Sequence, residues 1–267
     1  IPDDRCGWDA LLFNGLRSSL IRLPHLLHLA TSDILSRSRI VSSALPTEFQ
    51  PFLAVLTEGG FIIEDTIDEL DVIKGRFHND KETGPLHLVV TPTLNCNLAC
   101  TYCYQVHPPG TMTRDVCGRI VELARQKLKG GNITELNVDW YGGEPLLVPQ
   151  VISYLSGHLQ NLARESDCRY EASIATNGTL LDNQAVCLLV ANGVKTCQVT
   201  VDGPKEVHDK RRGYRQGHGS SFDRVLENMR RLVGRMELSV RINVDEDNIG
   251  HAYTLLDIFR EEGFFQH

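Results

Sequence analysis

The chain has 267 residues, of which 42% are hydrophobic, and it carries a formal charge of −7 with a pI near 5.8. This length suits one large domain, or one large domain with a small appendage. The acidic balance argues against a broad electrostatic surface for nucleic acid or anionic lipid, which needs clustered Lys and Arg. Nucleic acid is therefore not an expected partner, although a local basic groove of the kind found in RNA-modifying enzymes stays open.

Hydropathy and cysteine content bear on the compartment. No stretch approaches the roughly 20 apolar residues of a membrane-spanning helix, and no signal peptide opens the sequence, which begins at Ile1 rather than Met. Eight cysteines in a chain of this size, three of them within eight residues, are more typical of metal binding in a reducing compartment than of disulfides. We expect a cytoplasmic protein that does not associate with membranes.

Residues 1–80 predict a small α+β region. In chain order we expect a hairpin, two helices and a short strand, at Ala10–Leu23, His25–Ser36, Thr47–Glu58 and Phe61–Ile63. The dipeptide Asn14-Gly15 suits the hairpin turn, and Gly59-Gly60 ends the second helix. These elements suit either a winged-helix-like unit or an embellishment of the main domain. The polar run His78–Gly84 is the best candidate for a linker.

From residue 86 onward, strands alternate with helices of about 10–15 residues. We expect strands at Leu86–Thr91, Glu135–Tyr141, Tyr170–Thr176, Thr196–Val201 and Leu238–Val244. We expect helices near Arg114–Lys129, Val151–Arg164, Asn183–Asn192, Phe222–Val233 and Ile249–Glu262. This alternation predicts an α/β fold with a parallel sheet built from about five right-handed βα units. Another strand is expected to begin at Gly263–His267, so we expect the domain at 86–267 to be truncated at its C-terminus.

Three cysteines follow the first of these strands closely. Cys96, Cys100 and Cys103 lie in the segment TPTLNCNLACTYCY, where three thiolates can converge on one metal centre. A closed zinc site normally needs four ligands, and the nearest further candidate, His107, is followed by two prolines. A 4Fe–4S cluster with three cysteine ligands instead leaves one iron open to an exogenous ligand. A zinc knuckle completed from elsewhere and a set of core cysteines are the alternatives.

The spacing Cys-x3-Cys-x2-Cys, with Tyr102 just before the last cysteine, resembles the signature of radical S-adenosylmethionine (SAM) enzymes. The resemblance implies a partial (βα)6-type barrel, a 4Fe–4S cluster on Cys96, Cys100 and Cys103, and SAM as the ligand of the open iron. In that family, one electron cleaves SAM to a 5′-deoxyadenosyl radical that abstracts hydrogen from the substrate. The cofactor carries the chemistry, and the protein positions and shields it.

A glycine pair follows the second expected strand, in the segment WYGGEPLL. Two glycines at a strand end let a ligand approach the backbone closely, and a following carboxylate can accept from an ammonium group. Alone, such a segment is a common turn. Placed one βα unit after the cysteines, it resembles the GGE motif of the family, which implies that Gly142, Gly143 and Glu144 contact the SAM amino group.

The fourth expected strand ends in VTVDGP, and His208-Asp209 and Arg211-Arg212 follow it. This segment resembles the S-x-D-G-P…H-D-x-x-R motif of the radical SAM enzymes that mature peptides and proteins, including anaerobic sulfatase-maturating enzymes. The resemblance implies that Thr200 and Arg212 bind the SAM carboxylate or ribose, which suits a guanidinium because its donors match a carboxylate in pairs. A solvated charge pair is the alternative for the two arginines. His208-Asp209 is expected to be a structural turn rather than an acid–base pair.

Two other strand ends carry polar residues. The third expected strand ends in Thr176-Asn177-Gly178-Thr179, which is good turn chemistry and also fits the rim that faces SAM and substrate in the family. The fifth ends near Asn243, for which the resemblance implies a polar contact with the ribose or adenine. Among the other cysteines, Cys187 and Cys197 fall in apolar stretches and are expected in the core.

These motifs predict an oxidoreductase-type radical SAM enzyme that modifies a peptide or protein side chain. By resemblance, its partners are a peptide or protein substrate, which a leader peptide could bring to the N-terminal region, and an electron donor such as flavodoxin or ferredoxin. The subgroup usually carries a cysteine-rich C-terminal extension for auxiliary clusters, which this sequence does not contain. The alternatives are a radical SAM enzyme acting on a small molecule or tRNA, and a non-catalytic iron–sulfur or zinc-binding protein.

Overall fold

The computed structural model describes residues 10–15, 17–23, 25–37, 39–41, 49–75, 84–130, 132–217 and 219–266. The chain divides into two compact units, Ile1–His78 and Asn79–His267, and each is described here by itself. Among the described residues, no helix combines the length and the apolar character that crossing a bilayer would require.

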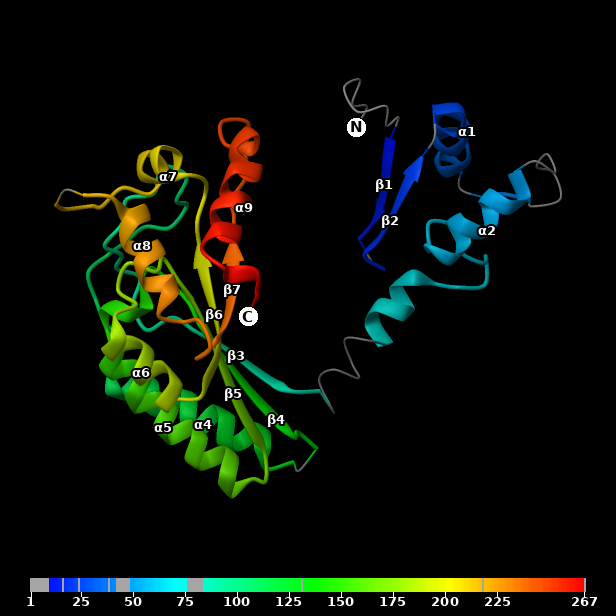
Figure 1. The fold of residues 1–267 in the computed structure, drawn as a ribbon. Helices are drawn as coiled ribbons and strands as arrows, with labels where there is room; N and C mark the ends of the chain where they lie inside the picture. The colour runs from blue at the N-terminus through cyan, green and yellow to red at the C-terminus, as the bar shows by residue number, and fades with distance from the viewer. Residues whose placement is uncertain are drawn as a thin grey trace. The chain divides into compact units, whose positions relative to one another are not determined.

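The first unit opens with an antiparallel hairpin that two helices follow. Strands β1 (Ala10–Asn14) and β2 (Ser19–Leu23) pair with each other, and helices α1 (His25–Ser36) and α2 (Gln50–Glu58) follow, which confirms the expected hairpin and both helices (Figure 1). The hairpin is joined to the end of α2, because the side-chain Nδ2 of Asn14 donates to the Gly60 carbonyl oxygen at 2.6 Å.

The strand expected at Phe61–Ile63 was wrong. The amides of Phe61 and Ile62 both donate to the Leu56 carbonyl, at 2.8 and 3.3 Å, and so close the end of α2 rather than pairing with another strand. A short helix that the sequence did not suggest covers residues 69–75. The expected linker falls almost wholly outside the described residues.

The second unit is built on a five-stranded parallel sheet with strand order β3-β4-β5-β6-β7. The strands are β3 (Leu86–Val90), β4 (Glu135–Trp140), β5 (Arg169–Thr176), β6 (Val194–Thr200) and β7 (Glu237–Arg241). Each strand pairs with the next along the chain, so the sheet winds in one direction as in a barrel segment. This confirms the expected α/β fold with a parallel sheet, and every predicted strand begins within two residues of its observed start.

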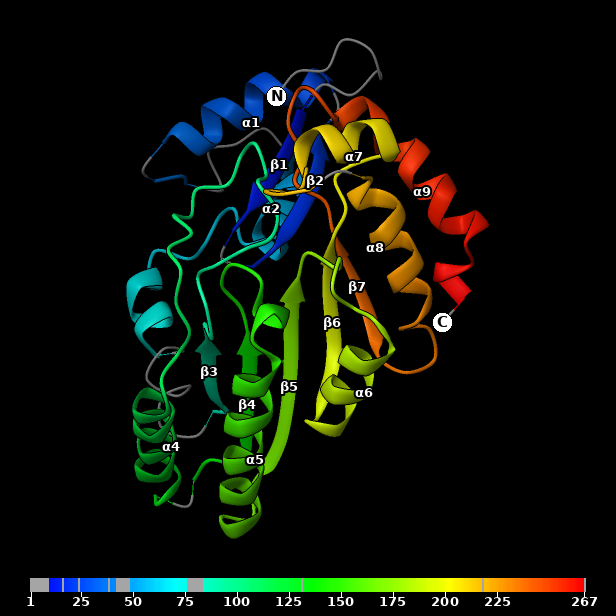
Figure 2. The same cartoon turned by 90° about the vertical axis from the view of Figure 1, so that its left-hand side faces the viewer.

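Helices cover one face of this sheet (Figure 2). They are α4 (Arg114–Leu128), α5 (Pro149–Glu165), α6 (Asn183–Ala191), α7 (Lys205–Arg211), α8 (Ser221–Arg230) and α9 (Ala252–Glu261). Three short 3-10 helices, η3 (Pro145–Leu147), η4 (Ile249–His251) and η5 (Phe264–Gln266), lie between or after them. Three of the longer helices begin at side-chain caps: Thr113, Asp182 and Ser220 accept from amides in the first turns of α4, α6 and α8.

At two positions, a helix is found where the sequence predicted a different structure. The segment containing His208 and Asp209 was expected to form a turn, yet it forms α7, in which the His208 amide donates to the Pro204 carbonyl at 2.8 Å. The strand expected to begin at residue 263 is instead the 3-10 turn η5, where Phe264 packs on Phe259 with 5.8 Å between the ring centroids.

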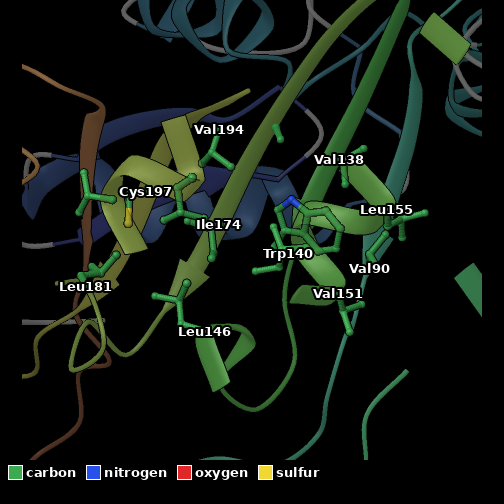
Figure 3. Packing of buried hydrophobic residues seen from close by; sticks show 14 of the residues in the cluster. Val90, Val138, Trp140, Leu146, Val151, Leu155, Ile174, Leu181, Val194 and Cys197 are labelled. Carbon is green, nitrogen blue, oxygen red and sulfur yellow. The ribbon is translucent and has the colours of Figure 1, made fainter. Parts of the chain in front are cut away.

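The core lies between the sheet and its helices. Figure 3 shows Trp140 packed among Val90, Val138, Val151 and Leu155. Trp140 and Leu155 are fully buried, and burying a large apolar side chain contributes about 1.5–3 kcal/mol. Because side chains alternate along a strand, the residues between these core positions face the other side of the sheet, which the helices leave uncovered.

Candidate functional site

The candidate site is a cavity of about 280 Å³ formed by the loops that follow the parallel strands. Nine of the ten predicted site residues line it: Cys96, Cys100, Cys103, Tyr102, Gly142, Gly143, Thr200, Arg212 and Asn243. They come from the last residue of β6 and from the segments after β3, β4, α7 and β7, because the carboxyl ends of parallel strands meet at one edge of a sheet. The tenth, Glu144, does not line the cavity.

The cysteine loop has no regular secondary structure, and backbone hydrogen bonds hold it in place. The Ala99 amide donates to the Gly213 carbonyl at 2.8 Å, and the Thr101 amide donates to the Arg211 carbonyl at 2.9 Å. Arg215 adds a side-chain contact, since its Nε donates to the Cys96 carbonyl at 3.2 Å. The segment after α7 therefore fixes the path of the loop, a role that the sequence did not reveal.

The three thiols differ in exposure. Cys96 is buried, Cys100 is partly exposed and Cys103 is exposed. Burial raises the pKa of the Cys96 and Cys100 thiols, so metal binding at these two positions must displace their protons. His107 approaches the loop as well, with its Nε2 3.3 Å from the Cys103 Sγ.

No three His, Cys, Asp or Glu side chains among the described residues are placed to hold a single metal ion. A four-iron cluster takes its thiolates around a core of several atoms rather than at one ion. The spread of the three thiols around one cavity therefore suits a cluster better than a closed mononuclear zinc site.

The glycine pair packs directly against the cysteine loop. A Cβ added at Gly143 would lie 2.2 Å from the Asn95 carbonyl oxygen and 2.4 Å from that of Leu94. Gly142 has a φ of +122°, and a Cβ there would lie 2.5 Å from the Thr93 carbonyl oxygen. Only glycine fits both positions, so the pair lets the two loops meet at the cavity wall.

Glu144 is fully buried, and its carboxylate serves the protein itself. It accepts from the Leu146 amide at 3.0 Å, from the Asn177 amide at 2.8 Å and from the Thr176 hydroxyl at 2.8 and 2.9 Å. Burial raises the pKa of this carboxyl despite these donors. We infer that Glu144 joins the loop after β4 to the end of β5, and its expected contact with an amino group stays a prediction.

A network of polar side chains also lines the cavity and forms its polar wall. Arg212 donates to the Tyr102 hydroxyl at 2.5 Å, and Asn243 Nδ2 donates to the same hydroxyl at 3.0 Å. The Tyr102 hydroxyl in turn donates to Asp202, which also accepts from the Asn243 amide at 2.9 Å. Burial raises the pKa of Tyr102 to about 12, so this hydroxyl stays protonated and its bond to Asp202 persists.

Both arginines of the expected pair are buried, which excludes the solvated alternative. Arg211 forms a bidentate pair with Asp245 at 2.8 and 2.9 Å, whereas Arg212 lies 3.8 Å from Asp202 and lines the cavity. Arg212 is 6% exposed, and within the described part of the chain its Nε has no hydrogen-bond partner. A buried donor without a partner is costly, so this nitrogen is suited to bind an incoming acceptor.

The end of β5 also reaches the cavity. Thr176 and Asn177 line it. The side-chain Nδ2 of Asn177 lies 3.7 Å from the Cys96 Sγ and donates to Asn97 Oδ1 at 2.8 Å. The sequence placed this segment at the rim but did not connect it with the cysteines. Away from the site, Cys197 is buried as expected, whereas Cys187 is exposed because Val186 and Leu189 form the inner face of α6.

His208 contacts the segment that follows β6 and makes the stability of the protein depend on pH. Its Nδ1 accepts from the Asp202 amide at 3.3 Å, and its Nε2 is buried without a partner among the described residues. Burial lowers the pKa of His208 to about 4. An unfolded histidine titrates near pH 6.5, so between about pH 6.5 and 4 the unfolded chain binds the additional proton.

We therefore expect acid to destabilise the protein through His208. The free energy of unfolding should fall as the pH drops from about 6.5 to 4, with a contribution of about 3 kcal/mol from this residue. His208→Asn keeps an acceptor but does not titrate, so urea unfolding between these pH values should show a shallower dependence. His158→Asn, at an exposed position, should keep the dependence of the unsubstituted protein. An equal slope in all three proteins would contradict this assignment.

Comparison with known proteins gives a consistent result. The family model of the radical SAM superfamily matches residues 90–251. The chain is 26% identical over 188 residues to the serine-type anaerobic sulfatase-maturating enzyme of Bacteroides thetaiotaomicron, covering 66% of this chain and 44% of that protein. It is 25% identical over 217 residues to the Fe-coproporphyrin III synthase of Methanosarcina barkeri, covering 74% and 49%.

Among solved structures, native anSMEcpe with bound AdoMet and Cp18Cys peptide is similar, with a TM-score of 0.57 and 27% identity. That similarity covers 67% of this chain and 49% of the other. The chain thus spans about half the length of the relatives that it matches.

Proposed function

Because the chain belongs to the radical SAM superfamily, an enzyme family whose cofactors are a 4Fe–4S cluster and SAM, we propose that it modifies a peptide or protein side chain by hydrogen abstraction. One observation carries the proposal: three cysteines, a glycine pair and a buried arginine from separate loops line a single cavity. The arrangement suits an open-iron cluster with SAM beside it. The anaerobic sulfatase-maturating relatives and the peptide in a similar solved structure support a peptide substrate.

The residues of the cavity fit these cofactors. Cys96, Cys100 and Cys103 would hold the cluster, and the backbone at Gly142 and Gly143 lets SAM approach closely. When bound, the cluster and SAM together supply a 5′-deoxyadenosyl radical after one-electron reduction, for which flavodoxin or ferredoxin is the proposed electron donor.

The polar wall of the cavity would orient SAM. The free Nε of Arg212 suits the SAM carboxylate, and the Thr200 hydroxyl and the Asn243 amide lie on the same cavity wall for the ribose or adenine. Tyr102, held by Asp202 and Arg212, completes this wall. Tyr102, Arg212 and Asn243 are already joined by hydrogen bonds, so little ordering of these side chains is needed when SAM binds.

We propose that the N-terminal region, residues 1–80, captures the peptide, in a cytoplasmic setting. A β-hairpin followed by helices suits a winged-helix-like element, in which a peptide can add a strand to a hairpin edge. This role rests on the arrangement of the elements and not on a motif in the sequence.

The proposed function is tested by SAM cleavage that depends on peptide. The anaerobically reconstituted protein is reduced with dithionite in the presence of SAM, and 5′-deoxyadenosine is measured with and without pools of randomised hexapeptides. We expect a peptide-dependent increase.

A second candidate, action on a small molecule, is favoured by the match to Fe-coproporphyrin III synthase. An increase with iron coproporphyrin and with none of the peptide pools would support that candidate instead.

A further inference from the structure

One part of the cavity is not used by the cluster or by the groups proposed to hold SAM. Arg241, Gln198 and Tyr141 line it from the ends of β7, β6 and β4. Gln198 and Arg241 stand next to Val199 and Val240, which pack in the core on the helix side of the sheet. Because side chains alternate along a strand, Gln198 and Arg241 lie on the face that the helices leave uncovered.

Arg241 differs from the other arginines of the site in its charge environment. Arg211 is paired with Asp245, and Arg212 lies beside Asp202 and Tyr102. Arg241 donates from Nε to Asn243 Oδ1 at 3.2 Å, and no carboxylate in the described part of the chain lies within ion-pair distance of it.

The carboxylates on the neighbouring surfaces are already engaged. Asp202 accepts from Tyr102 and from the Asn243 amide. Asp139, on the same face of β4, accepts from the Ser173 hydroxyl at 2.6 Å and lies 3.4 Å from the His87 ring. The guanidinium of Arg241 therefore faces the cavity as a cation without an anionic partner.

Tyr141 and Tyr104 extend this region across the cavity. Tyr141 belongs to the loop after β4 and Tyr104 to the cysteine loop, and both line the cavity. Tyr104 and burial raise the pKa of Tyr141, and the charge of the nearby Arg241 guanidinium lowers it. Gln198 adds an amide from β6, the strand next to β7 in the sheet.

We propose that Arg241, with Tyr141 and Gln198, forms a carboxylate-binding subsite that selects the substrate. The guanidinium offers paired donors that match a carboxylate, and the hydroxyl and the amide complete a set of neutral donors around it. The inference rests on the proposed peptide function and deepens it, because it assigns the preferred substrate an acidic group near the reacting centre. That group is either an Asp or Glu side chain or a C-terminal carboxylate.

Four pools of randomised hexapeptides test the subsite and separate the two sources. One pool carries acidic side chains and an amidated C-terminus, one is neutral with a free C-terminus, one is neutral and amidated, and one is basic and amidated. The reconstituted protein is assayed for 5′-deoxyadenosine formation above the peptide-free rate. We expect one carboxylate-bearing pool to stimulate about 10- to 100-fold more than the neutral amidated pool.

Two substitutions make the assignment specific. Arg241→Gln should remove this discrimination, and Arg241→Glu should transfer the preference to the basic pool. Arg119→Gln, at an exposed position on α4, is the matched control and should preserve the discrimination. SAM affinity is measured for each variant, with Arg212→Gln as the comparison for a lost SAM contact.

Equal stimulation by the carboxylate and the neutral pools would overturn the subsite while leaving the peptide function intact. A loss of SAM affinity in Arg241→Gln as large as that in Arg212→Gln would assign Arg241 to SAM and would also overturn it. If none of the pools stimulates cleavage, the peptide function itself fails, and the subsite fails with it.

Discussion

Replacing Cys100 by Ala is expected to abolish both the iron–sulfur cluster and all cleavage of SAM. Two remaining thiolates cannot hold a cluster whose fourth iron must stay open for SAM. The reconstituted variant should be colourless, contain little iron and release no 5′-deoxyadenosine. The side chain of Cys100 is partly exposed and small, so the apo-protein should lose at most about 1 kcal/mol of unfolding free energy.

Cys187→Ala is the matched control for this experiment. Cys187 is an exposed cysteine on α6, where its Sγ lies 3.1 Å from an Arg235 nitrogen and outside the residues that line the cavity. That variant should remain brown and active. A Cys100→Ala protein that still cleaved SAM would show the ligand assignment to be wrong. Unsubstituted protein that stayed colourless and held zinc would instead support the binding-protein alternative.

The parallel sheet could be predicted because its strands combine two strong local signals. Segments such as Leu136–Trp140 place an apolar residue at every second position, and a helix of at least nine residues lies between each strand and the next. Each strand is also followed by a loop of distinctive chemistry, so the cysteine, glycine-pair and Asp-Gly-Pro segments could be assigned to one edge of the sheet before any geometry was known.

What could not be predicted depends on contacts between loops distant in the sequence. Arg215 donates to the backbone of Cys96, 119 residues away, and no local pattern encodes that approach. The bonds that the Asn177 backbone amide and the Thr176 hydroxyl donate to the Glu144 carboxylate were not foreseen either, and the expected contact of Glu144 with the SAM amino group stays a prediction. Likewise, the apolar sequence of α6 did not show which side would face water, so Cys187 was wrongly expected in the core.

The subsite at Arg241 illustrates the same limit. In the sequence, Arg241 is one charged residue within the expected strand Leu238–Val244, and an exposed arginine there needs no explanation. Its significance comes from the residues around it, since Arg211 and Arg212 have partners from other loops and Arg241 has no carboxylate partner among the described residues. Charge accounting across the whole cavity is therefore needed to separate a ligand-binding cation from a surface one.

Gly143→Ala should disrupt the site almost as severely as loss of a cysteine, but through packing. The new methyl carbon would lie 2.2 Å from the Asn95 carbonyl oxygen and 2.4 Å from that of Leu94, and both are backbone atoms that cannot rotate away. The loop after β4 must therefore move away from the cysteine loop. That movement strains the hydrogen bonds that the Gly143 and Glu144 backbone amides donate to the Thr93 and Asn95 carbonyl oxygens, at 3.1 and 2.8 Å.

We expect this variant to lose about 1–3 kcal/mol of unfolding free energy or more, as overpacked interiors do, and to bind SAM at least about tenfold more weakly. Urea unfolding and equilibrium binding of SAM measure the two effects. Gly118→Ala is the control, because a Cβ there, within α4, meets no atom within 4 Å. Since alanine favours a helix over glycine, that variant should gain about 0.4–1 kcal/mol and keep its SAM affinity.

The pair of glycine variants separates a specific packing effect at the cavity wall from a general cost of replacing glycine. If Gly143→Ala unfolded at the same denaturant concentration as the unsubstituted protein and bound SAM equally well, the contact between the two loops would be dispensable. If both glycine variants lost stability to the same extent, the effect would reflect a general cost of substitution. A loss confined to Gly143 would instead show that the cluster and SAM depend on a backbone contact at which no side chain fits.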